Sequence, residues 1–244
     1  FWPGLAAVVR VFFNSPLKSE QVYRLCDDAA RHVQVLRMQP GMLLDVFNGL
    51  GGSYRAIIED MGKHSVTVKV LSFDSTDYPP ACQTHLVIGM PANERMDWLI
   101  EKATELGVTR ITPLMTQRTV LKLHGERGIK RQQHWMGIAQ SACAQSGRNQ
   151  LPLIDIPVSW SDWLTSPPSN PSLHIVLSLS IGLPSWRDVW LTPPSHLTLL
   201  SGPEGGLTPE EEAQALSMGF KAVSLGPMTL RAETAAIVVL AQLL

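Results

Sequence analysis

The sequence contains few cysteines and no long apolar segment. Its 244 residues include three cysteines, an odd number without a repeated spacing. That count argues against a disulfide framework and against a cysteine zinc site, so a reducing, cytoplasmic setting is the simplest expectation. No apolar run reaches the about 20 residues that cross a bilayer, and the opening FWPGLAAVVR lacks the charged start and cleavage site of a secretory signal. We therefore expect a globular protein with no membrane segment and no metal site.

Charge is also scarce, and it is unevenly distributed. Charged residues make up 17% of the chain and the net charge is −1, which by itself indicates no polyanionic partner. Residues 85–151 hold nine Lys and Arg against five Asp and Glu, a balance of +4, whereas residues 152–244 hold three against eight, a balance of −5. A basic middle segment favours either a localised surface for a polyanion or ordinary salt pairing on helix faces, and charge alone leaves both open.

The first part of the chain has the pattern of a small β domain. Residues 41–73 contain apolar segments separated by the turn-rich NGLGG, and in SVTVKVLSF three valines alternate with polar residues. This period of two predicts an antiparallel meander with one buried face. The preceding QVYRLCDDAARHVQVLRMQPG predicts one helix or two short ones. These segments together predict a β-barrel domain over residues 1–73, followed by a linker over residues 74–84 that contains Pro79-Pro80.

From residue 85 onward, strand patterns alternate with helix patterns. The predicted strands are HLVIGM, ITPLM, HIVLSLS, LTLLSG and AVSLG. The predicted helices are NERMDWLIEKATELG, ERGIKRQQHWMGIAQSACAQSG, TPEEEAQALSMG and AETAAIVVLAQLL, with Asn93 as a possible cap of the first and Gly107 and Gly147 as stops. Such alternation predicts an α/β domain over residues 85–244 whose parallel sheet is covered on both faces.

A cluster of glycines, LLSGPEGGL over residues 199–207, joins one of these strands to a helix. Thr208 is a good helix cap, Pro209 suits the first helical position and Glu211 completes a capping box. The cluster therefore lies at the carboxyl end of a strand, where open α/β sheets bind ligands. It fits neither the dinucleotide fingerprint nor the P-loop. A tight strand-to-helix turn without a ligand is the alternative interpretation.

A second strand, loop and helix follow at once in AVSLGPMTLRAETAAIVVLAQLL. Arg231 and Glu233 open a helix that is otherwise almost wholly apolar. Because isolated buried charge is costly, the two side chains must either satisfy each other or face a ligand. The helix itself is apolar nearly all round, which predicts burial in the core or in a dimer interface.

The two segments SGPEGGLTPEE and SLGPMTLRAETAA, in this order, resemble the C-terminal signature of SPOUT-class RNA methyltransferases. More narrowly, they resemble the RsmE family, which methylates N3 of one uridine in 16S ribosomal RNA. The resemblance extends through RMDWLIEKATELGVTRITPLMTQRTV, AQSACAQSGRNQLP, VVRVFFNSPL and HVQVLRMQPGMLLDVFNG, so it spans nearly the whole chain.

This resemblance implies a fold and a set of partners. Residues 1–73 would form a PUA-like RNA-binding β-barrel, and residues 85–244 a SPOUT α/β domain with a C-terminal trefoil knot. The cofactor would be S-adenosylmethionine, the substrate 16S rRNA within the small ribosomal subunit, and the protein a homodimer. Two rival interpretations are a non-catalytic RNA-binding or ribosome-assembly factor that keeps this fold, and a small-molecule enzyme with a nucleotide cofactor.

The resemblance also implies site residues. Arg231 would stabilise negative charge on the uracil ring, and Glu233 would act as base or orient Arg231. The implied cofactor-binding residues are Leu177, Ser178, Gly202, Pro203, Glu204, Gly205, Gly206, Leu225, Gly226, Leu230, Arg231 and Thr234. One position departs from the family pattern, since Met228 stands where the family has arginine after LGP. We therefore leave Met228 out of the charged site.

Contacts with RNA require cations for phosphate and planar groups for stacking. The candidate RNA-binding residues are Arg31, His32, Arg37, Arg95, Lys102, Arg118, Arg148 and Asn149. Arg95 and Lys102 are seven residues apart and share a helix face. For each residue taken singly, a solvated surface charge is the competing interpretation.

Overall fold

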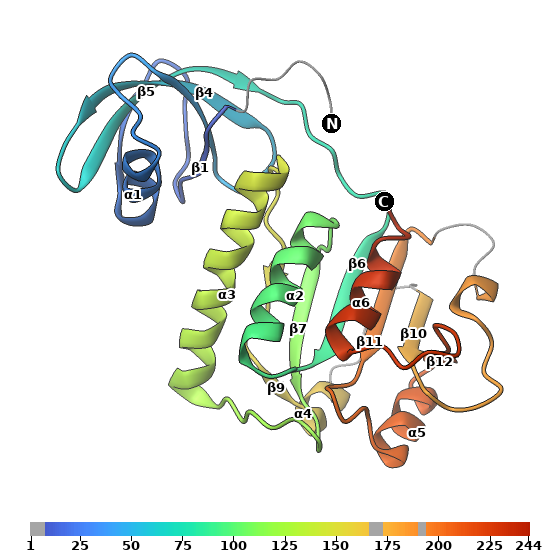
Figure 1. The fold of residues 1–244 in the computed structure, drawn as a ribbon. Coiled ribbons are helices and arrows are strands. Elements are labelled where there is room, and N and C mark those ends of the chain that lie inside the picture. The colour runs from blue at the N-terminus through green and yellow to red at the C-terminus, as the bar shows by residue number, and fades with distance from the viewer. Residues whose placement is uncertain (1–7, 166–172, 190–193) are drawn as a thin grey trace. The chain divides into compact units, whose positions relative to one another are not determined.

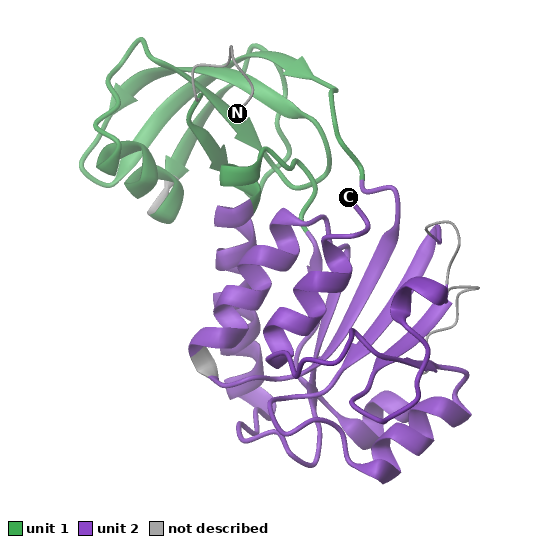
Figure 2. Ribbon diagram, turned by 45° about the vertical axis from the view of Figure 1, so that its right-hand side comes forward, with its two compact units in different colours: residues 1–79, 143–151 green, residues 80–142, 152–244 purple. Residues whose placement is uncertain are grey.

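The computed structural model describes residues 8–165, 173–189 and 194–244 (Figure 1). These residues form two compact units, Phe1–Pro79 with Cys143–Leu151 and Pro80–Ala142 with Pro152–Leu244 (Figure 2). The chain passes from the first unit to the second between Pro79 and Pro80, inside the segment expected to be a linker. No sequence pattern indicated that residues 143–151 belong to the first unit.

The described residues of the first unit form a five-stranded sheet in the order β1-β3-β4-β5-β2, one helix and the end of a second helix. Its elements are β1 (Arg10–Phe12), β2 (Val22–Cys26), α1 (Asp27–Val35), β3 (Leu43–Phe47), β4 (Ser53–Met61) and β5 (Ser65–Asp74). Strands β3, β4 and β5 pair antiparallel, which confirms the predicted meander. Val66, Val68 and Val70 alternate with more exposed residues and are fully buried, so the period of two marks the core face.

The predicted helix over QVYRLCDDAARHVQVLRMQPG is wrong in its first part. Residues Val22–Cys26 form strand β2, which pairs antiparallel with β5. Val22 and Tyr23 favour strands, and the open edge of β5 supplies the hydrogen-bonding partner, so tertiary pairing decides the local structure. The helix occupies only Asp27–Val35.

The second unit is built on a parallel sheet in the order β12-β10-β11-β6-β7-β8, with β9 also paired to β7. Its strands are β6 (Gln83–Gly89), β7 (Arg110–Met115), β8 (Leu153–Ile154), β9 (Val158–Ser159), β10 (Leu173–Leu177), β11 (His196–Ser201) and β12 (Lys221–Val223). Its helices are α2 (Asn93–Glu105), α3 (Gly125–Ser146, which ends in the first unit), α4 (Trp160–Leu164), the 3-10 helix η1 (Trp186–Asp188), α5 (Pro209–Ser217) and α6 (Ala232–Leu240). The predicted α/β alternation with a parallel sheet is confirmed.

Separate apolar clusters cover the two faces of this sheet. One contains Trp135 of α3, Leu99 of α2 and Val239 of α6, and the other contains Trp163 of α4 and Ala215 of α5 (Figure 1). Helix α6 packs against α2 and β11, so its apolar surface contributes to the core. In the part of the chain that the structure describes, every helix is too short or too polar to cross a membrane.

Strand β12 has neighbours on two sides. Along one side it pairs with β10. On the other, Ser224, which directly follows it, donates from its backbone N to Pro184 O at 3.0 Å and accepts from Trp186 N at 3.1 Å. The connection that leaves β10 therefore passes outside the end of β12, so that the chain at Val223 and Ser224 bonds to the β10 side through Val223 and to this connection through Ser224.

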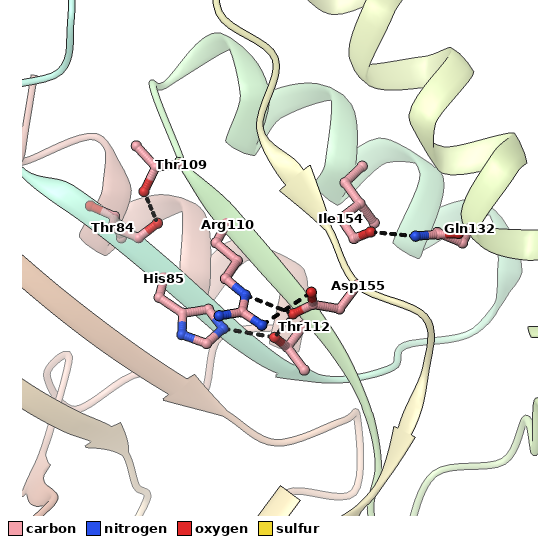
Figure 3. Close-up of polar contacts among 8 residues, drawn as sticks. All are labelled: Thr84, His85, Thr109, Arg110, Thr112, Gln132, Ile154 and Asp155. Atoms are coloured by element: carbon pink, nitrogen blue, oxygen red, sulfur yellow. Dashed lines mark hydrogen bonds and ion pairs between the residues drawn. The ribbon is translucent and has the colours of Figure 1, made fainter. Parts of the chain in front are cut away.

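A polar cluster ties together the amino-terminal parts of β6, β7 and the segment after β8 (Figure 3). The Thr112 hydroxyl donates to Asp155 Oδ2 at 2.5 Å and accepts from His85 Nε2 at 2.7 Å. Arg110 donates to both oxygens of the same carboxylate, at 2.8 and 3.2 Å. Burial, followed by the charge of Arg110, lowers the pKa of His85 to about 4, so this imidazole is neutral in the folded protein near neutral pH.

This histidine predicts a loss of stability in mild acid. Between pH 6.5 and about 4 the unfolded chain binds a proton at His85 that the folded chain does not bind. Stability is therefore lost as the pH falls through this window. Between pH 7 and pH 5 we expect wild type to lose about 2 kcal/mol more free energy of unfolding than His85→Gln, whose amide still donates to Thr112. Urea unfolding followed by tryptophan fluorescence measures this difference, and equal losses in both proteins would contradict it.

Candidate active site

Three loops leave the carboxyl ends of adjacent parallel strands and meet at one edge of the sheet. Strand β10 lies between β11 and β12, and all three run in the same direction. The loops begin at Ser178 after β10, at Gly202 after β11 and at Ser224 after β12. The carboxyl edge of such a sheet is where α/β proteins bind ligands, because strand ends leave backbone groups available there.

The glycine loop after β11 is closely packed against itself and against β6. A Cβ added at Gly202 would lie 2.7 Å from the backbone of Gly206 and Leu207, and one at Gly89 would lie 2.4 Å from Pro203 Cδ. Gly206 has φ +69°, and its backbone N donates to Pro203 O at 2.8 Å. Both the tight turn and the close approach therefore require glycine here.

The helix start beyond this loop is confirmed as predicted. Thr208 caps α5 and Glu211 completes the capping box, with Pro209 at the first position. The buried Glu211 carboxylate also accepts from Gln117 N at 2.8 Å. Arg118 donates from Nη1 to Gly205 O at 2.6 Å and to Leu207 O at 3.2 Å. The segment after β7 thus holds the glycine loop, and Arg118, predicted as an RNA contact, has a structural task within this unit.

A hollow of about 370 Å³ lies between the other two loops. It is lined by Leu179, Ser180, Ile181, Gly182, Leu183, Ser224, Gly226, Pro227, Met228 and Thr229. Gly226 has φ +118° and no atom within 4 Å of an added Cβ, so its backbone faces open space. The lining combines aliphatic side chains, hydroxyls and accessible backbone, so it can offer both apolar contacts and hydrogen bonds to a small molecule.

Sequence reasoning missed the Leu179–Leu183 side of this hollow. HIVLSLS was predicted to be a strand throughout, but β10 ends at Leu177. The Ser178 hydroxyl accepts from Ser180 N at 3.1 Å, and such a local bond turns the chain away from the sheet. The available signal was Gly182 and Pro184 after an apolar strand, which resembles the Gly-Pro pairs of the other two loops except that Leu183 lies between the two residues.

The predicted cofactor-binding residues are distributed over the three loops. Gly226 lines the hollow, Leu225 lies between the lining residues Ser224 and Gly226, and Leu230 follows the last of them. Leu177 and Ser178 precede the opposite wall, and Ser178 N donates to Val223 O at 3.1 Å. The residues Gly202, Pro203, Glu204, Gly205 and Gly206 form the third loop and are not among the lining residues. Met228 lines the hollow with 74% of its surface exposed.

Arg231 and Glu233 do not satisfy each other. Arg231 is the N-cap residue of α6, and its exposed side chain makes no hydrogen bond or ion pair with the described residues. Glu233 is 6% exposed, and its Oε1 lies 3.9 Å from Arg95 Nε. Its Oε2 is buried and has no hydrogen-bond partner among the described residues. A buried carboxylate oxygen without a donor is rare in folded proteins and points to a functional position.

The predicted RNA-binding residues of the second unit are engaged in ion pairs or hydrogen bonds. Arg95 Nη1 lies 3.3 Å from Glu204 Oε1, which also accepts from Ala92 N at 2.8 Å. Lys102 Nζ lies 2.7 Å from Glu101 and 2.9 Å from Glu105. Helix α2 begins at Asn93, with Ala92 at the cap position that had been considered for Asn93.

The predicted RNA-binding residues of the first unit have two different environments. Arg31, His32 and Arg37 are exposed in and after α1. Asn149 is 4% exposed, accepts from Arg10 Nη2 at 2.6 Å and donates to Thr76 O at 3.1 Å. Burial lowers the pKa of the neighbouring Arg148. These contacts favour a structural role for Asn149, and its contact with RNA stays a prediction.

The fold and the hollow at its carboxyl edge describe an α/β protein with a candidate site for a small molecule, and comparisons make this class more specific. Residues 78–244 match the family described as RNA methyltransferase domain. Residues 25–71 match the family described as RNA methyltransferase PUA domain. The first match covers more than half of the chain, including all three loops of the candidate site.

Named relatives agree with these matches. Ribosomal RNA small subunit methyltransferase E of Buchnera aphidicola is 30% identical over 97% of this chain and 92% of its own length. The protein of that name from Neisseria gonorrhoeae, in a structure bound to S-adenosyl methionine, has a TM-score of 0.89 and 33% identity over 96% of each chain. A Legionella pneumophila protein in complex with SAM has a TM-score of 0.90 and 35% identity over 97% of this chain and 96% of that one. The chain therefore belongs to the ribosomal RNA small subunit methyltransferase E family.

Proposed function

We propose that this protein transfers a methyl group from S-adenosylmethionine to N3 of one uridine in 16S rRNA, within the small ribosomal subunit. The observation that carries the proposal is the hollow of about 370 Å³ between the loops after β10 and β12. It lies in a chain whose family relatives are named as small-subunit rRNA methyltransferases, and one of them has a structure with bound S-adenosyl methionine.

The residues around the hollow fit this cofactor. Leu179, Ile181 and Leu183 offer an apolar wall for a purine ring, and the open backbone at Gly226 offers hydrogen-bonding groups beside it. The other residues proposed to hold it are Leu177, Ser178, Gly202, Pro203, Glu204, Gly205, Gly206, Leu225, Leu230, Arg231 and Thr234. When bound, the cofactor supplies a methyl group that its sulfonium already activates.

The protein must then make uridine N3 nucleophilic. N3 carries a proton, and its removal leaves negative charge on the uracil ring. Arg231, exposed beside the segment that lines the hollow, stabilises that charge. Glu233, two residues later, has a buried carboxylate oxygen without a donor among the described residues and accepts the proton. Because a stacked base is out of reach, the uridine is turned out of its stack.

RNA is held by cations outside this centre. The exposed Arg31, His32 and Arg37 of residues 1–73, proposed as a PUA-like β-barrel domain, contact the phosphate backbone. The match of residues 25–71 to an RNA methyltransferase PUA domain supports this assignment. Arg148 and Asn149 of the first unit stay proposed RNA contacts, whereas the charge of Lys102 is matched by Glu101 and Glu105 of its own helix. Residues 74–84 are proposed as the linker and residues 85–244 as the methyltransferase domain.

The class of the fold, its knot, the oligomeric state and the location in the cell belong to the same proposal. We infer a SPOUT-class domain with a C-terminal trefoil knot, in a cytoplasmic homodimer. The pairing of β12 with β10, together with the backbone bonds of Ser224 to Pro184 and Trp186, supports the knot, since it brings the chain before α6 alongside the connection that leaves β10.

Methyl transfer to small ribosomal subunits that lack the modification tests the proposal. Labelled S-adenosylmethionine is the donor, and the labelled nucleoside is isolated and identified. We expect N3-methyluridine at a single position. Label on another atom or base would overturn the assignment of the target. Absence of cofactor binding would favour the alternative, a non-catalytic ribosome-assembly factor with this fold.

A further inference from the structure

One guanidinium joins two carboxylates from different parts of the candidate site. Arg95, in the first turn of α2, lies 3.3 Å from Glu204 through Nη1 and 3.9 Å from Glu233 through Nε. Glu204 belongs to the loop after β11, and Glu233 to the first turn of α6. Glu204 also accepts from Ala92 N at 2.8 Å, so the start of α2 holds this loop through two bonds to one oxygen. These contacts fix three chain segments that are distant in sequence.

Other charged groups near α6 have different partners. Helix α2 and strand β11 pack against α6. On α2, the Asp97 carboxylate bonds His134 and Trp135 of α3 and lies 3.6 Å from Arg131, while Glu101 and Glu105 pair with Lys102. Glu94 is exposed, and His196 stands at the start of β11, the opposite end from the loops. Among the described residues, Arg95 is the cation within 4 Å of the Glu233 carboxylate.

The charge of Arg95 is therefore already matched by two carboxylates, which argues against its predicted role as a phosphate contact. An arginine suits the bridging position because its planar group presents donors in two directions, whereas a lysine offers one compact charge. We propose that Arg95 is a positioning residue of the methyltransferase site, which holds Glu204 and Glu233 and so fixes the start of α6, with Arg231 at its cap, against the glycine loop. This inference rests on the proposed function.

The test separates positioning from RNA binding. For Arg95→Met we expect kcat to fall about tenfold and the Kd for S-adenosylmethionine to rise about tenfold. Each change has the size expected from the loss of one hydrogen bond between charged groups. The KM for unmodified small ribosomal subunits stays within about twofold, because RNA is bound elsewhere. Arg95→Lys has intermediate values. The control is Arg127→Met, the same change at an exposed residue of α3 that has no ion pair with the described residues, and it leaves all three constants unchanged.

A second variant keeps the inference testable if Arg95→Met does not fold. Glu204→Gln keeps Arg95 paired with Glu233, and Glu204 is partly exposed, so the fold tolerates it. If Arg95 has a positioning role, Glu204→Gln raises the Kd for the cofactor and lowers kcat. If Arg95 instead contacts phosphate, removing the Glu204 charge strengthens RNA binding and lowers KM. That result, or unchanged constants in both variants, overturns the inference, whereas absence of cofactor binding by wild type overturns the proposed function.

Discussion

Replacing Arg231 by alanine is expected to lower kcat for methyl transfer about 100-fold or more, a larger effect than the accompanying loss of cofactor affinity. Arg231 caps α6 and follows the segment Ser224–Thr229 that lines the hollow. Its side chain has no ion pair with the described residues, so its removal breaks no internal contact seen there. Donors placed where charge develops commonly contribute factors of about 100 to 1,000 to kcat, because they act in a site that is already organised.

Single-turnover methylation of small ribosomal subunits, with the cofactor saturating, measures this effect directly. Isothermal titration with S-adenosylmethionine measures affinity separately, and the melting temperature confirms an unchanged fold. Arg127→Ala is the matched control, since it removes an exposed arginine of the same unit outside the site. A loss confined to KM for RNA would assign Arg231 to binding, because an interaction made equally in ground and transition states leaves kcat unchanged.

Substitution of Gly202 by alanine is expected to disrupt both stability and activity. The new Cβ would meet the backbone carbonyl carbon of Gly206 and the nitrogen of Leu207 at 2.7 Å, and backbone atoms cannot move aside as a side-chain end can. We expect a loss of about 1–3 kcal/mol in the free energy of unfolding, as for other overpacked sites. Displacement of the loop that carries Glu204 is expected to lower kcat/KM about 100-fold.

Gly137→Ala supplies the opposite control. Gly137 is exposed in α3 and has open space around an added Cβ, so alanine relieves the entropic cost of glycine in a helix. It should stabilise the protein by about 0.5–1 kcal/mol and leave methyl transfer unchanged. Chemical unfolding and the methyl-transfer assay on both variants check the pair. If Gly202→Ala had the same unfolding free energy and the same methyl-transfer activity as wild type, the close packing of the loop would contribute nothing to stability or activity.

The sequence was most informative where local chemistry alone decides the structure. The capping box from Thr208 to Glu211 and the alternating valines of β5 were predicted and confirmed, because each depends on neighbouring residues only. Val22–Cys26 was predicted wrongly as helix, because its pairing with β5, 39 to 47 residues further along the chain, is invisible in a local pattern. The alternation of strands and helices predicted the parallel sheet, and with it the edge where the loops meet.

The loops of the candidate site were predicted from the sequence, but their contacts were not. Glycine after an apolar strand located the loops at residues 202–206 and 224–231. It did not reveal that Arg95, 138 positions before Glu233, is its ion-pair partner, or that Arg118 holds the glycine loop by its carbonyls. Both arginines lie in a basic segment that indicated a polyanion surface. Periodicity and charge counts carry no information on which residues meet across a sheet, so ion pairing within the unit was indistinguishable from an RNA surface.

The position of β12 between β10 and the loop that follows it bears on the order in which the molecule is assembled. Residues 221–240 come after every other strand of the sheet in the chain, so during synthesis the other strands emerge first. One wall of the hollow, at Ser224–Thr229, and the helix that carries Arg231 and Glu233 enter only afterwards. A nascent chain that ends before residue 221 can pair β6, β7, β10 and β11 yet has no second wall to hold a nucleoside. Competence for methyl transfer is therefore acquired only when residues 221–240 have been made, after the scaffold of the sheet.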